Sequence, residues 1–140
     1  MNVNIDIDKK SFMNDFKFHT KNLYAIYYKK RTYFPVLYIK QVKRTRKGWH
    51  IKLLFQDKEK SDDNLKEITI RQLFGDDRLR CVYDYLRMSR KENIHSLLFD
   101  YKNKRKAILR EDIKNKMNKH IKKQERIWKK FEEKNKRFFG

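Results

Sequence analysis

Apolar and polar side chains alternate strictly over residues 2–8, and this pattern limits the fold more than any other feature of the chain. The apolar positions are Val3, Ile5 and Ile7, and the polar positions are Asn4, Asp6 and Asp8. Successive side chains of a β-strand point to opposite faces, so the segment predicts a strand with one buried face and one polar face. We therefore expect the chain to begin with a half-buried strand of a sheet.

The next segments predict a helix and a β-hairpin. Ser11 is placed to cap a helix whose apolar residues recur at roughly helical spacing. These residues are Phe12, Phe16, Leu23, Ile26 and Tyr27. Residues 33–42 and 48–55 are rich in aliphatic and aromatic side chains and are joined by a basic turn over residues 43–48. This arrangement predicts a hairpin of two antiparallel strands.

Two short helices are expected after a charged loop over residues 56–66. Thr69 and Gln72 have the spacing of a capping box, which predicts a helix that Gly75 ends. Asp76 and Asp77 can start a second helix with apolar residues on one face. These apolar residues are Leu79, Val82, Tyr83 and Leu86.

The complete order of elements predicts an α+β fold. Residues 94–101 are a short apolar run and predict a fourth strand, and a long helix is expected from about Ala107. The order β-α-β-β-α-β-α is typical of a ferredoxin-like or RRM-like βαββαβ core with an antiparallel four-stranded sheet, here followed by a long basic C-terminal helix. In that core the first and third strands are central neighbours and the fourth flanks the first. Two helices cover one face of the sheet, and the other face is expected to be open unless the terminal helix folds across it. We expect a domain over residues 1–101 and a helical extension over residues 102–140.

If the apolar side chains of the strands face the helices, three carboxylates and one histidine meet on the opposite face. They are Asp6, Asp8, His50 and Asp100. Carboxylates two residues apart on a strand, with a third nearby, can hold a divalent metal ion against triphosphate oxygens, and a histidine can donate to a phosphate. Asp6, Asp8 and Asp100 are therefore candidate ligands for Mg²⁺ or Mn²⁺, and all four residues are candidate catalytic residues. If the protein is not an enzyme, no cofactor is expected.

The charge of the chain narrows the choice of partner. There are 38 Lys and Arg against 18 Asp and Glu, which gives a net charge of +20. Nucleic acid, an anionic membrane surface and an acidic protein are the partners that such a charge suits, and an aromatic content of 14% favours nucleic acid. We expect DNA or RNA phosphates to be bound by the hairpin residues Lys40, Lys43, Arg44, Arg46, Lys47 and Lys52 and by the helix residues Lys114, Lys122 and Lys129.

Other charged and apolar residues are assigned no site. The arginines at positions 78, 80, 87 and 90 are interpreted as surface charges of their helix. Cys81 is the only cysteine, which excludes an intramolecular disulfide, and we expect it to be a small core residue. The C-terminal helix has an apolar stripe that predicts either core packing or self-association. The stripe consists of Leu109, Ile113, Met117, Ile121, Trp128 and Phe131.

No apolar run approaches the ~20 residues that span a bilayer. The first ten residues also lack the layout of a signal peptide. We therefore expect a soluble, cytoplasmic protein with no membrane partner.

Three motifs resemble those of the archaeo-eukaryotic primase superfamily. The stretch Thr45-Arg46-Lys47-Gly48-Trp49-His50 is similar to that family's Ser-x-x-Gly-aromatic-His segment, with Thr45 in place of serine. Asp6-Ile7-Asp8 resembles its Asp-x-Asp metal motif, and Leu98-Phe99-Asp100 resembles its third motif. The resemblance covers about residues 2–101. It implies an RRM-like palm in which Asp6, Asp8 and Asp100 bind metal and His50 contacts the phosphates of the incoming nucleotide.

Two related families fit less well. Sequence-specific RRM proteins resemble the chain at Lys47-Gly48-Trp49, but they require outward-facing aromatic residues on the third strand, where burial of Trp49 and Ile51 is expected here. Rolling-circle replication endonucleases use a His-x-His pair, which none of the four histidines forms.

The sequence thus predicts a small nucleic-acid-binding protein with a primase-palm-like core, for which metal-dependent nucleotidyl transfer in replication of a mobile element or virus is a further hypothesis. A non-catalytic DNA-binding or RNA-binding protein, or one that blocks a host factor with the same basic surface, is the alternative.

Overall fold

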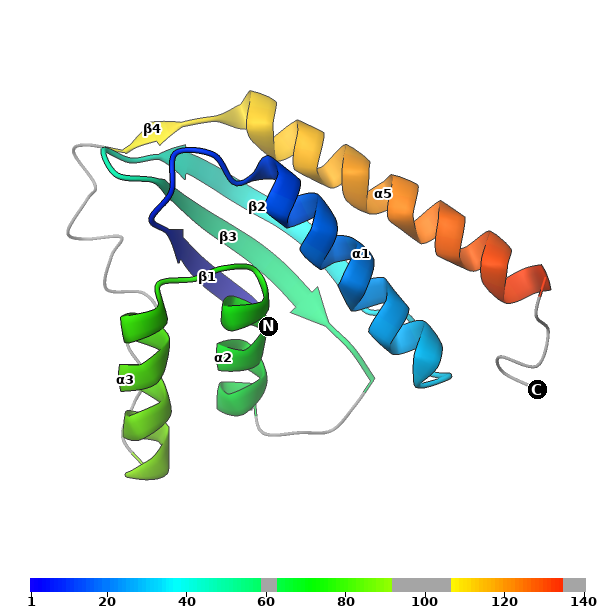
Figure 1. The fold of residues 1–140 in the computed structure, drawn as a ribbon, viewed down its shortest axis with the longest axis horizontal. Helices are drawn as coiled ribbons and strands as arrows, with labels where there is room; N and C mark the ends of the chain where they lie inside the picture. The colour runs from blue at the N-terminus through cyan, green and yellow to red at the C-terminus, as the bar shows by residue number, and fades with distance from the viewer. Residues whose placement is uncertain (59–62, 92–106, 135–140) are drawn as a thin grey trace.

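A computed structural model describes residues 1–58, 63–91 and 107–134 of the chain (Figure 1). Its elements are β1 (Asn2–Ile7), α1 (Met13–Lys29), β2 (Val36–Arg44), β3 (Trp49–Gln56), α2 (Asp63–Leu73), α3 (Arg78–Ser89), β4 (Ile108–Leu109) and α5 (Glu111–Lys134). The expected α+β class is therefore confirmed. Within the described ranges, no helix has both the length and the apolar character needed to cross a bilayer.

The strands form one antiparallel sheet in the order β1-β3-β2-β4. The predicted hairpin is β2 and β3, and β1 pairs with β3 as expected. The two-residue strand β4 lies beside β2, whereas the sequence predicted a fourth strand beside β1. That predicted strand, residues 94–101, lies outside the described residues. The structure thus establishes a four-stranded antiparallel sheet, and the ferredoxin-like arrangement stays a prediction.

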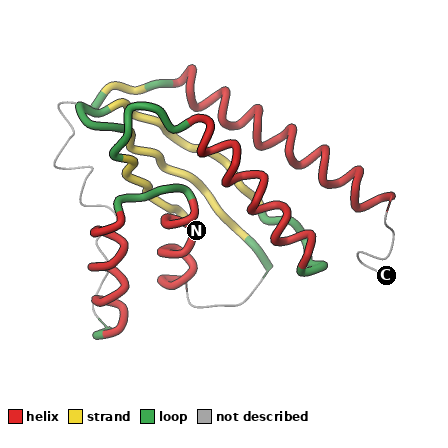
Figure 2. The backbone as a smooth tube through the Cα atoms, in the orientation of Figure 1, coloured by secondary structure: helices red, strands yellow, loops and turns green. Residues whose placement is uncertain are grey.

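Helices α1, α2 and α5 supply apolar side chains to a core on one face of the sheet (Figures 1 and 2). The predicted alternation of β1 and β3 is confirmed on this face. From the strands the core takes Val3, Ile5, Ile7, Leu37, Ile39, Val42, Trp49, Ile51, Leu53 and Phe55, from the helices Phe16, Leu23, Tyr27, Ile70, Met117 and Ile121, and from the turn after α2 Phe74. From the predicted apolar stripe, Met117 and Ile121 are therefore core residues, whereas Leu109, which lies on β4, and Phe131 are 50% and 49% exposed.

Two helix starts differ from the sequence predictions. Ser11 does not cap α1: the N-cap position is Phe12, which makes no side-chain hydrogen bond to the helix. Thr69 lies inside α2, where its hydroxyl donates to the carbonyl of Leu65 at 2.8 Å instead of capping a helix end. Gly75 ends this segment as predicted. Its φ is 83°, a backbone angle that residues other than glycine rarely adopt.

The turn between β2 and β3 requires a glycine because β1 passes directly beside it. A Cβ on Gly48 would lie 1.7 Å from the carbonyl oxygen of Ile7. The backbone N–H of Thr45 donates to the carbonyl of Gly48 at 2.9 Å, and the N–H of Gly48 donates to the Thr45 hydroxyl at 3.0 Å. This turn leaves Arg46 and Lys47 exposed at its tip.

Helix α5 is joined to the outer edge of β2 by a side-chain amide. Asn118 accepts from the backbone N–H of Ile39 at 2.8 Å and donates to the Ile39 carbonyl at 3.0 Å. Just before the helix, the N–H of Arg110 donates to the carbonyl of Val42 at 2.8 Å. These bonds satisfy backbone groups that an edge strand would otherwise leave open.

Candidate functional site

Asp6 and His50 are brought together as the sequence predicts. They are directly opposite each other in the β1-β3 pairing. The Nε2 atom of His50 lies 3.3 Å from Oδ1 of Asp6, and the Asp6 side chain is 29% exposed. Lys43 is opposite His50 on β2, so the three residues form one row across the polar face of the sheet.

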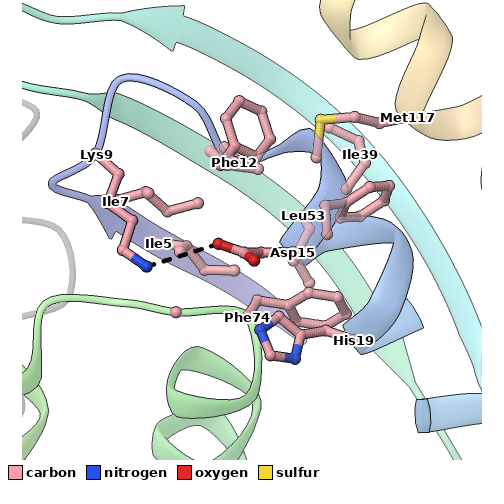
Figure 3. Close-up of a pocket in the computed structure, with 13 residues that line it drawn as sticks. Ile5, Ile7, Lys9, Phe12, Asp15, His19, Ile39, Leu53, Phe74 and Met117 are labelled. Atoms are coloured by element: carbon pink, nitrogen blue, oxygen red, sulfur yellow. Dashed lines mark ion pairs between the residues drawn. The ribbon is translucent and has the colours of Figure 1, made fainter. Parts of the chain in front are cut away.

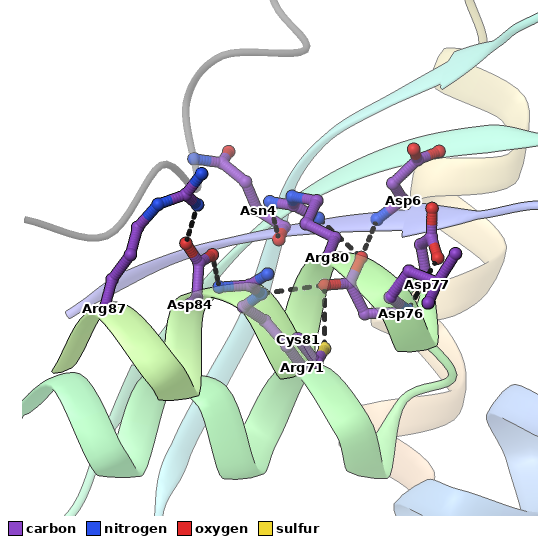
Figure 4. Close-up of polar contacts among 10 residues, drawn as sticks. Asn4, Asp6, Arg71, Asp76, Asp77, Arg80, Cys81, Asp84 and Arg87 are labelled. Atoms are coloured by element: carbon purple, nitrogen blue, oxygen red, sulfur yellow. Dashed lines mark hydrogen bonds and ion pairs between the residues drawn. The ribbon is translucent and has the colours of Figure 1, made fainter. Parts of the chain in front are cut away.

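The main chain of Asp6 is held from the other side by the start of α3. Its N–H donates to Oδ1 of Asp76 at 2.6 Å, and its carbonyl accepts from the N–H of Asp77 at 2.9 Å. These two hydrogen bonds fix the backbone of Asp6, and Figure 4 shows its N–H directed at Asp76.

The remaining predicted ligands do not complete a metal site in the described residues. Asp8 lies just beyond the end of β1 and is exposed, and Asp100 lies outside the described residues. In the described part of the chain, no three His, Cys, Asp or Glu side chains are grouped so that they could hold a metal ion. Binding of Mg²⁺ or Mn²⁺ stays a prediction.

The polar face of the sheet is also less open than the sequence suggested. Asn4 and His50, which lie at its centre, are only 3% and 6% exposed. An imidazole buried to this degree has little surface left for an incoming phosphate. The expectation of a wholly open face is therefore wrong at these two positions.

Three of the predicted phosphate-binding residues gather at the hairpin end of the sheet. Arg46 and Lys47 are exposed at the tip, and the guanidinium of Arg44 lies 4.9 Å from the centre of the Trp49 ring. Arg44 also donates to the carbonyl of Gly48 at 3.1 Å. Because residues alternate along β2, Arg44 points away from the face that carries Lys43. The predicted rim is thus divided between the two faces.

Arg110 joins this group, although the sequence predictions did not include it. Its guanidinium lies 5.6 Å from the centre of the Trp49 ring. It pairs with Asp112 through Nε at 3.0 Å and Nη2 at 2.9 Å, and this hydrogen bonding lowers the pKa of Asp112 to about 2. We call Arg44, Arg46, Lys47 and Arg110 the hairpin cluster.

Trp49 itself is part of the core rather than of the binding surface. It is 7% exposed, packs against Phe12 with ring centres 5.0 Å apart, and donates from Nε1 to the carbonyl of Lys10 at 3.0 Å. The ring can therefore support the two arginines but cannot stack on a nucleic-acid base.

The other predicted phosphate-binding residues are dispersed. Lys40 is exposed and donates to the side chain of Asn2 at 3.2 Å, while Lys43 and Lys52 are half-buried along the strands. On α5, Lys114 pairs with Glu111 at 2.9 Å, and this hydrogen bond raises its pKa. Lys122 and Lys129 are exposed.

A buried ion network links α2 and α3 to the edge of β1 and was missed by the sequence predictions (Figure 4). Arg71 is completely buried, and its Nε and Nη1 atoms donate to Asp76 and Asp84, each at 2.7 Å. Arg80 pairs with Asp76 and donates to the carbonyl of Asn4, and Arg87 pairs with Asp84. Arg80 and Arg87 are thus structural residues and not the free surface charges that we expected.

The electrostatics of this network follow from its burial. Burial opposes the charge of Arg71, but Asp76 and Asp84 outweigh it and raise the pKa of Arg71. Cys81 is also buried, as expected, and its thiol donates to Asp76 at 3.2 Å. Burial and then Asp76 raise the pKa of this thiol to about 12, which suits a structural residue and not a nucleophile. The spacing of Arg80, Asp84 and Arg87 on one helix face is the signal that could have indicated the network.

An apolar pocket of about 60 Å³ between α1 and the sheet is too small for a nucleotide, since ligand sites usually measure about 300–1,000 Å³ (Figure 3). Ile5, Phe12 and Phe74 are among its walls. The ion pair between Lys9 and Asp15, at 3.6 Å, lies at its side. We assign this pocket no function.

Comparisons of the chain with protein-family models, with curated proteins and with solved structures give no match. The primase resemblance therefore rests on the sequence motifs alone.

Proposed function

We propose that this protein binds DNA or RNA, and that the hairpin cluster is the surface that grips the phosphate backbone. The observation that carries this proposal is the stacking of Arg44 and Arg110 over Trp49, next to the exposed Arg46 and Lys47. Four cationic side chains from three segments meet there, at the end of the sheet where the hairpin turns.

The geometry favours phosphate contacts over base contacts. A guanidinium held against an aromatic ring is already ordered, so it loses less conformational entropy when it binds a phosphate. Trp49 is buried and unavailable for base stacking, and base readout would need groups that reach into a groove. We therefore expect binding with strong salt dependence and little sequence preference.

Fluorescence anisotropy of labelled single-stranded and double-stranded DNA and RNA across a salt series tests this proposal. The double variant Arg46→Gln/Lys47→Gln should weaken binding and lower the slope of log affinity against log salt by about 1.4 for single strands or 1.8 for duplex DNA. The matched control is Arg78→Gln/Arg90→Gln, which removes the same charge from exposed positions at the start of α3 and directly after its end. Equal losses in the two variants, or an affinity that salt does not change, would contradict the proposal.

A second candidate function is metal-dependent nucleotidyl transfer, and the specific observation in its favour is the Asp6–His50 pair. Carboxylate oxygens are the donors that Mg²⁺ and Mn²⁺ prefer. Asp6 supplies one such donor beside an imidazole, and Asp8 and Asp100 are the further ligands that the motif resemblance implies. The bound metal would neutralise the charge of a nucleoside triphosphate, while His50 orients the Asp6 carboxylate.

Paramagnetic broadening by Mn²⁺ tests this second function without an activity assay. Binding at Asp6 should broaden the ring signals of His50 in NMR spectra, and Asp6→Asn/Asp8→Asn should abolish the effect. The control Asp112→Asn removes a carboxylate at the start of α5 and should leave the broadening unchanged. Primer synthesis from nucleoside triphosphates should be lost in the same Asp6→Asn/Asp8→Asn variant. If Mn²⁺ leaves His50 unaffected in the wild-type protein, this function is excluded.

A further inference from the structure

A groove with almost entirely cationic walls lies between the first half of α1 and the middle of α5. Its volume is about 280 Å³. The groove is lined by Met13 and Lys17 from α1 and by Lys116, Lys119, His120, Lys123 and Arg126 from α5. No carboxylate is among these lining residues. None of the five lining Lys and Arg side chains forms an ion pair with another described residue.

The groove exists because α1 and α5 pack side by side (Figure 1). Met117 and Ile121 are buried in the core, which fixes the rotation of α5 about its axis. Residues three and four positions apart share a helix face, so this rotation places Lys116, His120 and Lys123 next to α1. Bringing like charges together in this way costs free energy, which an anion in the groove would offset.

His120 provides a second and independent sign of a ligand. Its ring lies against Phe16, with ring centres 5.9 Å apart, and its Nε2 atom is buried without a hydrogen-bond partner among the described residues. Buried polar atoms are almost always hydrogen-bonded, and a water molecule or an ion is one explanation for an atom that has no partner in the protein. An anionic oxygen in the groove would satisfy this nitrogen.

We propose that the α1–α5 groove binds phosphate groups of a nucleic-acid backbone. This inference deepens the proposed function, on which it rests for the identity of the polyanion. Between Lys116 and Arg126 the helix rises ~15 Å, which is the axial length of about four nucleotides of one strand. The groove would therefore extend the interface from the hairpin cluster along the two helices.

Binding in the groove should take up a proton at His120. Burial, and then the charges of Lys17 and Lys123, lower the pKa of His120, which favours the neutral imidazole in the free protein. The groups facing it are Lys17 and Phe16 on α1, with Lys116 and Lys123 on its own helix. The negative charge of a bound phosphate favours the protonated imidazole and raises the pKa of His120. The affinity for nucleic acid should therefore increase as the pH falls towards about 6.

The decisive experiment compares two double variants of the full chain that remove the same charge from one helix. Lys119→Gln/Lys123→Gln alters the groove, and Lys130→Gln/Lys134→Gln alters exposed positions of α5 that do not line it. The probe is fluorescein-labelled oligothymidine, titrated across a salt series. The groove variant should lose about tenfold in affinity and about 1.4 in salt slope, and the control less than about twofold. Equal losses in the two variants overturn the inference.

The hairpin variant Arg46→Gln/Lys47→Gln separates this inference from the proposed function. If only the hairpin variant loses affinity, the groove is overturned and the proposed function stands. If only the groove variant loses affinity, the groove is supported and the hairpin proposal fails.

NMR titration of His120 supplies a readout that a general loss of charge would not change. Oligothymidine should raise the pKa of His120 by about one unit, and His120→Gln should remove the corresponding increase in affinity at low pH. Inorganic tripolyphosphate is the second probe: if it shifts His120 and oligothymidine does not displace it, nucleic acid is overturned as the source of the phosphate. If neither probe changes the His120 titration, the phosphate site itself is overturned.

Discussion

Helices α3 and α5 have similar apolar periodicity and bury opposite faces. On α5, Met117 and Ile121 are buried and the lysines point outward. On α3, the buried residues are Cys81 and Asp84, while the apolar stripe is on the outside. Its members Leu79, Val82, Tyr83 and Leu86 are 65%, 43%, 57% and 41% exposed. Amphipathic spacing therefore indicates that a segment is helical, but the neighbouring element decides which face is buried.

The polar face of α3 is buried because it packs against Arg71 on α2. An arginine that is completely buried needs carboxylate partners, because an unpaired charge in the interior is too costly. Asp76, in the turn before α3, and Asp84, on α3, supply these carboxylates, and the position of Asp84 directs the polar face of α3 inward. Helix α5 faces the apolar side chains of the sheet, so the apolar residues Met117 and Ile121 in its first half are buried.

The largest effect on stability is expected when this ion network loses one partner. Asp84→Ala should reduce the free energy of unfolding by about 3–5 kcal/mol, because it leaves the buried Arg71 charge without one of its two carboxylates. Urea denaturation followed by circular dichroism measures the change. The exposed ion pair of Asp112 is the control, and Asp112→Asn should leave the midpoint unchanged. If Asp84→Ala also leaves it unchanged, the network does not hold α3.

Cys81 should report when the same helix detaches. Its pKa of about 12 leaves about a thousandfold less thiolate than an ordinary cysteine, and the sulfur is buried as well. Labelling by a thiol reagent at pH 8 should therefore be slow in the wild-type protein and faster in Asp84→Asn. Rapid wild-type labelling would mean that α3 opens without global unfolding.

On α5, removal of a core side chain should have a moderate effect. Ile121→Ala should cost about 2–5 kcal/mol, because it creates a cavity between the helix and the sheet. The measurement is the same urea titration. A cost below 1 kcal/mol would show that α5 is not part of the cooperative core.

The smallest effect is expected on the outer face of α3. Leu86→Ala should change the free energy of unfolding by no more than about 0.5 kcal/mol, because Leu86 is exposed. The difference in unfolding free energy between Leu86→Ala and Ile121→Ala tests directly whether the apolar stripe is exposed on α3 and buried on α5. A loss as large as that of Ile121→Ala would contradict the outward orientation of the apolar stripe.

Much of the sheet could be predicted from the sequence, because strand alternation is a local property. The buried positions of β1 and β3, the hairpin, and the placement of Asp6 next to His50 all follow from side-chain parity and chain order. The burial of His50 could not be predicted, since it depends on what packs over the polar face. Nor could the pairing of β4 with β2, because a two-residue strand has no periodicity to detect.

The candidate binding surfaces divide in the same way. The sequence by itself determined a strongly basic α+β chain with a cationic turn, because charge and residue order do not depend on packing. Only the tertiary structure brought Arg110 to Trp49, Lys17 to His120, and Arg71 to Asp84. These contacts join residues that are far apart in sequence or on different elements, and they form because packing of the core sets the rotation of each helix.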